Sequence, residues 1–370
     1  AGTEEGTEGS TDPIVIGFPT ASTEFLSFYD GPILESAQLA ADDINANGGL
    51  LGGRMIEITH ADNQSDIALV ESRAIELLDA GADIIHTSCD FDFGSPAARA
   101  ATERGVFALG CASAPEYGFE GLGELVFNTF PADVTESAVM AQFTIDQGWD
   151  QAVLFQDQSL EATITVCDTF AEVYEELGGT VVGVETFEGA DFSLAPQLAS
   201  VRDSDAQAIV LCTTNSAAVK QIRDETDLPI VSQVALEGTF WLDCCPGLSD
   251  FYAVGLASVA GDDPDPGRAA FIESYTEATG APPLLSIVMA GYAAVEALAI
   301  AIEEAGSVDG AAIAEAMSGF DNVELVTGAT SYSPTCHIPI GRDMVMIQVQ
   351  DGEYSFAAEV EPTFLPESIC

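Results

Sequence analysis

The sequence predicts an α/β fold in which two lobes each hold a parallel sheet covered by helices. Strands and helices alternate with short links from Pro13 onward, which is typical of repeated βαβ units. Residues 13–66 contain one complete unit of this kind. Three extended runs lie between helical units and predict crossings that form a three-stranded hinge. A length of 370 residues is enough for about two domains.

The first unit starts with the apolar strand 14–16, which ends at Gly17. A loop with Phe25, Phe28 and Tyr29 follows, and then a helix with apolar residues at helical spacing. The segment 47–49, Asn-Gly-Gly, ends that helix because these residues accept a left-handed cap. An alternating strand comes next. Ligands of open α/β sheets bind beyond the carboxyl ends of the strands, so the loop after Gly17 lies where a ligand would sit.

The later elements follow the same alternation. We expect strands at 14–17, 55–60, 83–87, 106–110, 125–129, 151–155, 180–185, 207–212, 229–233, 252–258, 325–332, 343–350 and 354–358. We expect helices at 31–47, 66–80, 94–104, 133–147, 159–177, 192–201, 214–225, 266–279, 284–305 and 309–317. The crossings are predicted at Phe127–Pro131, Tyr252–Ala260 and Thr327–Ser333. Residues 1–12 are rich in Gly, Thr and Glu and read as a disordered tether, and residues 362–370 as an irregular tail.

The charge is strongly negative, since 61 acidic residues face 9 basic ones and give a net charge of −52. Such a field repels phosphate backbones, which excludes nucleic acid as a partner. We favour a solvated acidic surface over metal storage or a cationic partner. A high-salt or acidic habitat is a hypothesis that a melting temperature rising with salt would support. No apolar run reaches the roughly 18 residues that a bilayer requires.

Eight cysteines form an even set without a C-x-x-C pair, which disfavours zinc and thioredoxin-like sites. In an exported chain such a set favours disulfides, with buried free thiols as the alternative. Cys89 and Cys111 follow strands that we expect to be adjacent, so this pair is the first prediction and Cys167 with Cys212 the second. We expect the neighbours Cys244 and Cys245 each to bond elsewhere.

Several motifs resemble one family. The helix end AADDINANGGLLGGRMIEI followed by ADNQSD is similar to the opening of type I periplasmic solute-binding proteins, in the branch that binds branched-chain amino acids for ABC importers. The similarity continues, in order, at APEYG (114–118), FNTFPAD (127–133), LEG (236–238), Ala290–Tyr292 and VTGATSYS (326–333). It covers nearly the whole chain from Pro13 onward. The opening motif is specific, and the order of the others supports it.

The resemblance implies two Rossmann-like lobes that close on a small solute by hinge motion. It gives residues 13–130 plus 261–328 as lobe 1, and 131–260 plus 329–361 as lobe 2. It also implies an extracytoplasmic monomer without a cofactor, which delivers an amino acid-like ligand to the membrane subunits of an ABC permease. In this family a tether often follows a lipid-modified cysteine, so the resemblance implies a lipid anchor.

The first candidate segment is Thr87–Ser95, after a strand and at the start of a helix, where N–H groups can bind a carboxylate. The family has a Gly-Pro-x-Ser-Ser-like segment here, and this chain departs from it with Ser88, Cys89, Asp90 and Phe91. Asp90 either repels a ligand carboxylate or caps the helix. Phe91 lines the ligand site or fills the core, and the spacing does not decide.

The second candidate segment is Gly110–Pro115, similar to the family's carboxylate-binding S-P-x-A-T-x-P. The alignment puts Cys111 and Ala112 at backbone-binding positions and Ser113 at the position of the threonine. The Ser113 hydroxyl could bond a ligand carboxylate or belong to an ordinary turn. The third candidate is Glu237, where family members hold the ligand ammonium with an acidic residue. The alternative for Glu237 is a solvated surface carboxylate.

Three further residues complete the predicted ligand set. Tyr29 aligns with an aromatic residue that packs over the ligand in the family, with Phe25 and Phe28 as alternatives. Leu160 stands where the family often has the tyrosine of D-x-x-Y-G, and Thr213 follows the strand that ends at Cys212. Because these aromatic residues are missing, the sequence does not predict the shape of the pocket.

Enzyme motifs are missing from the sequence: there is no G-x-S-x-G, Walker loop, H-E-x-x-H or G-x-G-x-x-G after a strand. We therefore expect a binding protein and not an enzyme. A second hypothesis keeps the fold but changes the ligand to an amide, urea-like or aromatic compound, since the segment after Thr87 departs from the family. A third is a sensor domain that reports the ligand to a receptor without transport.

Overall fold

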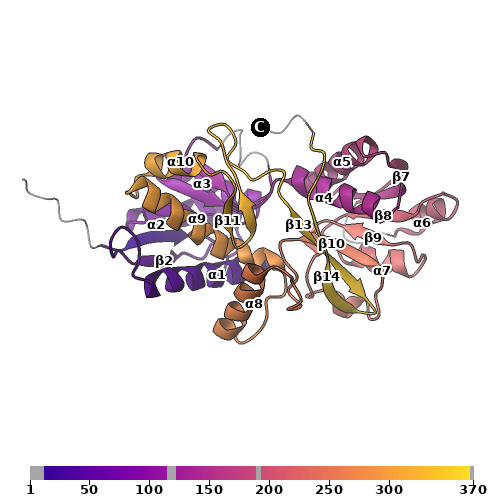
Figure 1. The fold of residues 1–370 in the computed structure, drawn as a ribbon, viewed down its shortest axis with the longest axis horizontal. Coiled ribbons are helices and arrows are strands. Elements are labelled where there is room, and N and C mark those ends of the chain that lie inside the picture. Colours follow the sequence, from indigo (N-terminus) through magenta and orange to yellow (C-terminus); the bar gives the residue numbers. More distant parts are fainter. Residues whose placement is uncertain (1–11, 115–121, 189–192, 367–370) are drawn as a thin grey trace, which may run out of the picture. The chain divides into compact units, whose positions relative to one another are not determined.

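The structure is a computed structural model that describes residues 12–114, 122–188 and 193–366. The chain forms two compact units (Figure 1). Unit 1 consists of the residues up to Phe130 together with Ala290–Leu325 and Thr330–Ile338, and unit 2 consists of Pro131–Met289, Val326–Ala329 and the residues from Pro339 onward. Both units are parallel α/β structures, so the predicted fold class is confirmed.

Unit 1 is built on a five-stranded parallel sheet of order β2-β1-β3-β4-β5. Its strands are β1 (Ile14–Phe18), β2 (Ile56–His60), β3 (Ile84–His86), β4 (Phe107–Gly110) and β5 (Val126–Asn128). Its helices are α1 (Ser27–Ala46), α2 (Ile67–Asp79), α3 (Phe91–Thr102), α9 (Met289–Ala305) and α10 (Gly310–Ser318). All five strands run in one direction, so their carboxyl ends share one edge of the sheet.

The core of unit 1 depends on close backbone approach. Most members of one buried cluster are alanines, which let helices α2 and α3 lie close to the sheet. At Gly291 in α9, an added Cβ would lie 2.0 Å from the carbonyl oxygen of Ile33 in α1. At Gly310 in α10, an added Cβ would lie 2.5 Å from the oxygen of Gly105. The late helices α9 and α10, orange in Figure 1, therefore pack directly against the N-terminal elements.

Unit 2 is built on a seven-stranded sheet of order β14-β13-β10-β9-β8-β6-β7, in which only β13 runs antiparallel to both of its neighbours. Its strands are β6 (Gln151–Asp157), β7 (Thr180–Phe187), β8 (Ala208–Cys212), β9 (Ile230–Ser232), β10 (Phe251–Gly255), β13 (Met344–Gln350) and β14 (Glu353–Val360). Its helices are α4 (Asp133–Asp146), α5 (Glu161–Glu176), α6 (Ala195–Arg202), α7 (Ala217–Arg223) and α8 (Pro266–Thr279). Large aliphatic and aromatic side chains dominate one of its core clusters.

Helix starts are the main difference from the predicted elements. Helix α1 begins at Ser27, because the amides of Tyr29 and Asp30 donate to the carbonyl oxygen of Leu26 over 3.0 and 3.1 Å. Phe28 and Tyr29 therefore lie in the helix and not in the loop. Helix α3 also begins earlier than predicted, at Phe91. The predicted strand 325–332 is instead a pair of short strands, β11 (Val323–Leu325) and β12 (Gly328–Thr330).

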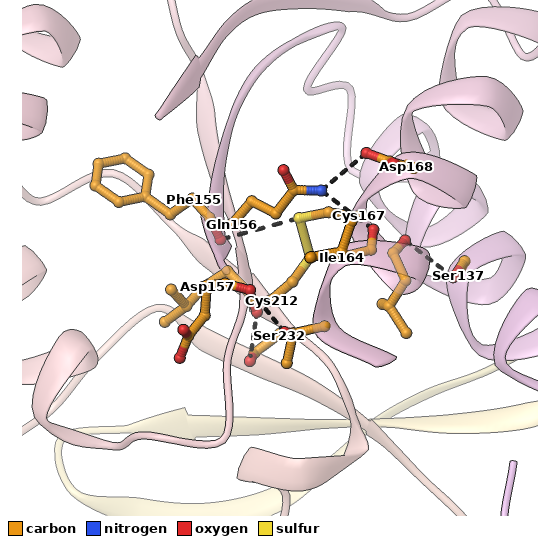
Figure 2. The surroundings of a disulfide bond; sticks show 12 residues. Ser137, Phe155, Gln156, Asp157, Ile164, Cys167, Asp168, Cys212 and Ser232 are labelled. Atoms are coloured by element: carbon orange, nitrogen blue, oxygen red, sulfur yellow. Dashed lines mark hydrogen bonds between the residues drawn. A yellow bond between two sulfur atoms is a disulfide. The ribbon is translucent and has the colours of Figure 1, made fainter. Parts of the chain in front are cut away.

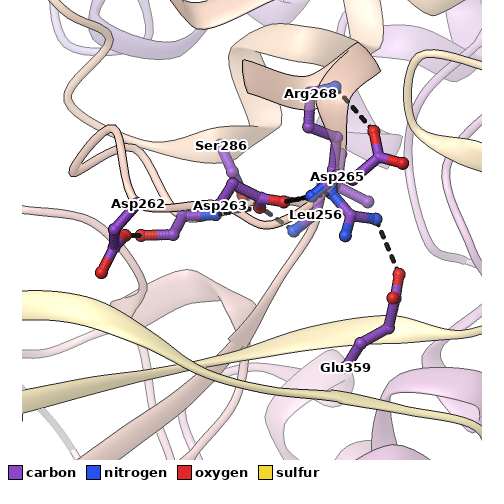
Figure 3. Close-up of polar contacts among 8 residues, drawn as sticks. Leu256, Asp262, Asp263, Asp265, Arg268, Ser286 and Glu359 are labelled. Carbon is purple, nitrogen blue, oxygen red and sulfur yellow. Dashed lines mark hydrogen bonds and ion pairs between the residues drawn. The ribbon is translucent and has the colours of Figure 1, made fainter.

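The division of the chain also differs from the predicted one at residues 261–289, which group with unit 2 and not with the first lobe. Arg268 explains the difference, because its buried guanidinium pairs with Asp263 at 2.9 Å and with Glu359 of β14 at 2.8 Å (Figure 3). The chain passes from unit 2 to unit 1 at Met289–Ala290 and not within Tyr252–Ala260. It also changes unit within Phe127–Pro131 and within Thr327–Ser333.

The expectation that no apolar run is long enough for a bilayer is wrong, because one helical stretch in the described part of the chain, Ser286–Ala305, is long and apolar enough by length and composition. Its mean hydropathy is 1.6, and 72% of it is buried. Glu296 interrupts its apolar sequence. The burial is that of a core helix, which agrees with the contact between Gly291 and helix α1.

The disulfides confirm two predictions and correct one. Cys89 bonds Cys111, as the expected strand order suggested, and Cys167 bonds Cys212, which was the second predicted pair. The expectation that Cys244 and Cys245 bond elsewhere is wrong, because they bond each other. No other described cysteine is left as a partner for either of them, since Cys336 is itself disulfide-bonded.

Some predictions fall outside the described residues. These are nearly all of the predicted tether (1–11) and most of the APEYG motif (within 115–121). They also include the first residue of the helix predicted at 192–201 (within 189–192) and the end of the tail (367–370).

Candidate functional site

The carboxyl edge of the sheet in unit 1 carries a buried pair of polar side chains. The hydroxyl of Ser88, just after β3, donates to Oδ1 of Asp30 in α1 over 2.8 Å. The amide of Ala21, in the loop after β1, donates to Oδ2 of Asp30 over 2.8 Å. Ser88 is 1% and Asp30 2% exposed. The Asp30 carboxylate therefore holds together the loops that follow β1 and β3.

Asp30 is protonated more easily than an ordinary aspartate. Burial raises its pKa from 3.8 to about 6, and the negative charge of Asp90 raises it further, while the bonds from Ala21 and Ser88 lower it. A neutral and an ionised form of this edge are therefore both accessible near pH 6.

A disulfide joins the two candidate segments of unit 1. Cys89 follows β3, Cys111 follows β4, and their bond ties the loop with Ser88 to the loop with Ala112 and Ser113. Ala112 is buried, and its carbonyl accepts a hydrogen bond from Asn128 of β5. Ser113 is half-buried, and its hydroxyl bonds no other residue within the described chain. Of the candidate hydroxyls, Ser113 is thus the one left for a ligand.

Asp90 caps helix α3, which was one of the two roles predicted for this residue. Its Oδ1 accepts from the amide of Phe93 over 3.2 Å, and its own amide donates to Ser88 Oγ over 3.2 Å. Phe91 and Tyr29 are half-buried and pack against the alanine-rich cluster of unit 1. Phe25, in contrast, is 71% exposed and meets Phe93 edge-on at 5.9 Å.

His86 lies at the end of β3 and stacks on Phe18 of β1, with 4.4 Å between the ring centres. Its side chain is buried, and within the described residues neither ring nitrogen has a hydrogen-bond partner. Burial lowers its pKa to about 3, so the ring is neutral at physiological pH. The histidine adds no positive charge to this edge.

The sheet of unit 2 repeats the arrangement of hydroxyl and carboxylate. The hydroxyl of Thr213, just after β8, donates to Oδ2 of Asp157 at the end of β6 over 2.7 Å. Both side chains are buried. The hydroxyl of Thr163 donates to the carbonyl oxygens of Asp157 and Leu160, each over 2.7 Å. Asp157 therefore lies next to both predicted residues, while the Leu160 side chain is 47% exposed.

A disulfide lies directly beneath this pair. Cys212, the neighbour of Thr213, bonds Cys167 of α5, and both are fully buried (Figure 2). Close by, Gln156 donates to Asp168 over 2.8 Å and to the carbonyl of Ile164 over 3.1 Å (Figure 2). Helix α5 is thereby fixed to strands β6 and β8 at the end where Leu160 and Thr213 lie.

Glu237 is neither a surface residue nor a partly buried one, since it is 1% exposed. Its Oε1 accepts from the Ser286 amide over 2.5 Å, the Ser286 hydroxyl over 3.0 Å and the Ile287 amide over 3.3 Å. Among the described residues, Oε2 has a single and longer contact, 3.4 Å from the Tyr354 hydroxyl. Burial raises the Glu237 pKa to about 7, although these donors lower it. Oε2 is the less satisfied side of this carboxylate.

Sequence reasoning missed the acceptors of the two hydroxyls. Asp157 is the last residue of a buried strand, which is a signal that could have found it. Asp30 lies in the first turn of a helix, 58 residues from Ser88, and nothing in the local pattern reveals its partner. Both residues are acidic in a chain with 61 acidic residues, so residue type alone could not single them out.

At the carboxyl edge of each sheet, hydrogen bonds hold polar side chains in fixed orientations. The Ser88 and Thr213 hydroxyls donate to carboxylates, and these bonds orient the loops that carry them. Within the described residues the Ser113 hydroxyl of unit 1 has no hydrogen-bond partner, and Oε2 of Glu237 in unit 2 has one long contact. A hydroxyl suits a ligand carboxylate, and a carboxylate suits a ligand ammonium.

Comparison with known families agrees with the fold. A family model described as periplasmic binding protein matches residues 13–353. The chain belongs to this family. Its resemblance to type I solute-binding proteins is thereby confirmed, and the family consists of periplasmic or extracytoplasmic binding proteins and not of enzymes.

Individual relatives are distant but cover nearly the whole chain. A Leu/Ile/Val-binding protein homologue from Brucella melitensis is 23% identical over 332 residues, 87% of this chain and 88% of the relative. The branched-chain amino acid transporter substrate-binding protein LivJ from Streptococcus pneumoniae, solved with isoleucine, is 24% identical with a TM-score of 0.77, covering 95% of this chain and 100% of LivJ. A solute-binding protein from R. palustris, solved with benzoate, is 18% identical with a TM-score of 0.75, covering 96% and 99%.

Proposed function

We propose that this chain is the extracytoplasmic solute-binding component of an ABC importer and captures a small amino acid-like ligand. The family match over residues 13–353 supports the transport role. Two relatives named for branched-chain amino acids, the Brucella melitensis homologue and LivJ, favour the ligand class. The proposed mechanism is the predicted hinge closure, in which ligand contacts from both lobes favour the closed form.

The observation that carries the ligand proposal is the state of the Glu237 carboxylate. One of its oxygens is fully used by Ser286 and Ile287, which fixes the side chain. In the part of the chain that the structure describes, the other oxygen has only the 3.4 Å contact with Tyr354. A ligand ammonium at this oxygen would gain a charge-assisted hydrogen bond in a buried site, and the ionised form of Glu237 would be favoured.

The other predicted residues divide into direct and indirect roles in this proposal. Ser113 would donate to the ligand carboxylate, with the backbone of Cys111 and Ala112 beside it. Tyr29 and Phe91 would provide apolar contact in the first lobe, and Leu160 in the second. A separate group acts through the loops. Ser88, Asp90 and Thr213 would hold the loops in place and not touch the ligand.

Calorimetry with a panel of amino acids tests the proposal. We expect at least one branched-chain amino acid to bind, and Glu237→Gln to weaken it about 10- to 100-fold, the cost of a lost bond to a charged group. Glu353→Gln, on the exposed surface of β14, is the matched control and should leave the affinity unchanged. Binding should also strengthen between about pH 6 and 8, because Glu237 ionises over that range.

Two outcomes would overturn the amino acid assignment: no binding by any amino acid, or equal affinity of the wild type and Glu237→Gln. The benzoate complex of the R. palustris relative favours a second candidate, an aromatic carboxylate, in the same fold. In that case benzoate binds, Ser113→Ala weakens it, and Glu237→Gln has no effect. The sensor hypothesis stays a third candidate, tested by whether a permease or a receptor binds the loaded protein.

A further inference from the structure

The vicinal disulfide of unit 2 lies in the loop that follows Glu237. Cys244 and Cys245 bond each other at the end of a short 3-10 turn, Leu242–Cys244. Cys244 is exposed, whereas Cys245 is 8% exposed and packs in the core cluster of unit 2. One residue of the pair is therefore open to solvent while the other packs in the core.

Access separates this pair from the Cys167–Cys212 disulfide of the same unit. Reduction starts when a thiolate reaches a disulfide sulfur. Both Cys167 and Cys212 are fully buried, so that bond is out of reach in the folded protein. Its loop of 45 residues also gives it a clear role in stability. A bond between sequence neighbours closes no such loop, so the chain-entropy argument gives Cys244–Cys245 little stabilising role.

Hydrogen bonds connect the pair to the segment of Glu237. The amide of Cys244 donates to the Trp241 carbonyl over 3.0 Å, and the Trp241 indole donates to the Leu236 carbonyl over 3.0 Å. Leu236 is the residue before Glu237. At Gly238 an added Cβ would lie 2.3 Å from the Leu284 carbonyl, so the same segment is pressed against the turn that binds Glu237. A change at the disulfide can reach Glu237 through Trp241.

We propose that Cys244–Cys245 is a redox modification site, reduced by an external dithiol, that controls the packing of Trp241 and the segment 236–245. A thiolate of the dithiol attacks Cys244 Sγ, the Sγ–Sγ bond breaks, and Cys245 leaves as a thiolate that takes up a proton. The second thiol of the reductant then attacks the mixed disulfide and releases Cys244. Two electrons and two protons pass to the protein, and the dithiol becomes a disulfide. This site is independent of the proposed ligand.

Graded reduction of the folded protein tests the site. The protein is equilibrated with increasing dithiothreitol, alkylated with iodoacetamide and digested for mass spectrometry. We expect the peptide with Cys244 and Cys245 to be doubly alkylated at a dithiothreitol concentration at least tenfold below that which labels Cys167 and Cys212. Equal sensitivity of the two pairs, or alkylation of Cys244 without any reductant, would overturn the proposal.

The coupling to Trp241 needs a second readout. Trp149→Phe leaves Trp241 as the one tryptophan of the chain, so its emission reports on this loop. In that background we expect dithiothreitol and the double substitution Cys244→Ser with Cys245→Ser to shift the emission alike. The double variant should show no further shift with reductant, and circular dichroism shows that it is folded. If a folded double variant keeps the oxidised emission, the pair does not control the loop.

Discussion

In both units, a hydrogen bond from a hydroxyl to a buried aspartate fixes a turn at the carboxyl edge of the sheet. In unit 1 Ser88 follows β3, donates to a buried aspartate and accepts from the amide two residues later, at Asp90, which caps α3. In unit 2 Thr213 follows β8, donates to Asp157 and accepts from the amide of Asn215, whose side chain binds the amide of Ala217 at the start of α7. In both units a hydroxyl sets the strand-to-helix turn.

The difference lies in the aspartate and in the disulfide. Asp157 belongs to a strand next to that of Thr213, while Asp30 comes from a helix 58 residues away from Ser88. The disulfide next to Ser88 joins two loops, whereas the one next to Thr213 joins a helix to a strand inside the core. Unit 1 thus fixes its edge by long-range contacts between loops, and unit 2 by the core beneath it.

The largest expected effect separates the two disulfides. Replacing both cysteines of a pair by alanine removes a cross-link that closes a loop of 45 residues in unit 2 or of 22 residues in unit 1. The chain-entropy model gives losses of unfolding free energy of about 4 and about 3 kcal/mol, respectively. Replacing the buried Cys167–Cys212 pair also leaves a cavity, which increases the difference between the two losses. Urea unfolding of the two double variants measures it. A larger loss for Cys89→Ala with Cys111→Ala would contradict the assignment of the core bond to unit 2.

The next effect concerns Asp30 and pH. Because its pKa rises from 3.8 to about 6 on folding, its ionisation opposes folding, and stability is lost as pH rises from about 4 to about 6. A shift of this size corresponds to about 3 kcal/mol. Asp30→Asn should remove this dependence, so its stability relative to the wild type should increase over that range.

Urea unfolding at several pH values measures this difference. Asp42→Asn, an exposed position on the same helix, is the control for loss of one charge from a very acidic protein. If both variants follow the same pH curve, the buried carboxyl of Asp30 does not titrate as described.

A smaller effect tests the shared hydroxyl motif. Ser88→Ala and Thr213→Val each remove a bond to a buried carboxyl, at a cost of about 2 kcal/mol in unfolding free energy near neutral pH. For Ser88→Ala the cost should shrink below about pH 6, where Asp30 is neutral. A double-mutant cycle of Ser88→Ala with Asp30→Asn measures the coupling. Additive effects would show that the two side chains do not interact.

The smallest effect concerns Leu160. Because its side chain is 47% exposed, Leu160→Ala should change the unfolding free energy by no more than about 0.5 kcal/mol. Any loss of ligand affinity in this variant then reports a direct contact. A large loss of stability would show that Leu160 belongs to the core of unit 2.

Periodicity predicted the order and type of nearly all described elements, since most strands of these sheets are short runs rich in apolar residues and many of them are followed by a helix. Helix α8 was predicted at its observed bounds because Asp265 and Gly280 are clear caps. The start of α1 was missed because Phe28 and Tyr29 resemble loop aromatics when their contacts are unknown. Strand order also predicted Cys89–Cys111, since both cysteines follow adjacent strands.

The site was less accessible to sequence reasoning. Glu237 was found through its motif, but its burial depends on Ser286 and Tyr354, 49 and 117 residues away. The vicinal disulfide was missed because adjacency in sequence says nothing of whether a local turn brings the two sulfurs together. The grouping of 261–289 was missed for a similar reason, because it depends on the pairing of Arg268 with Glu359.

Helices α9 and α10 pack against residues made much earlier, with the backbone of Gly291 against Ile33 and that of Gly310 against Gly105. During synthesis, about half of the chain is therefore translated after the last strand of the N-terminal sheet before these contacts can form. A nascent chain that ends before α9 would leave the surfaces of α1 and β4 without these contacts. Unit 1 therefore cannot complete its packing until these two helices have been made.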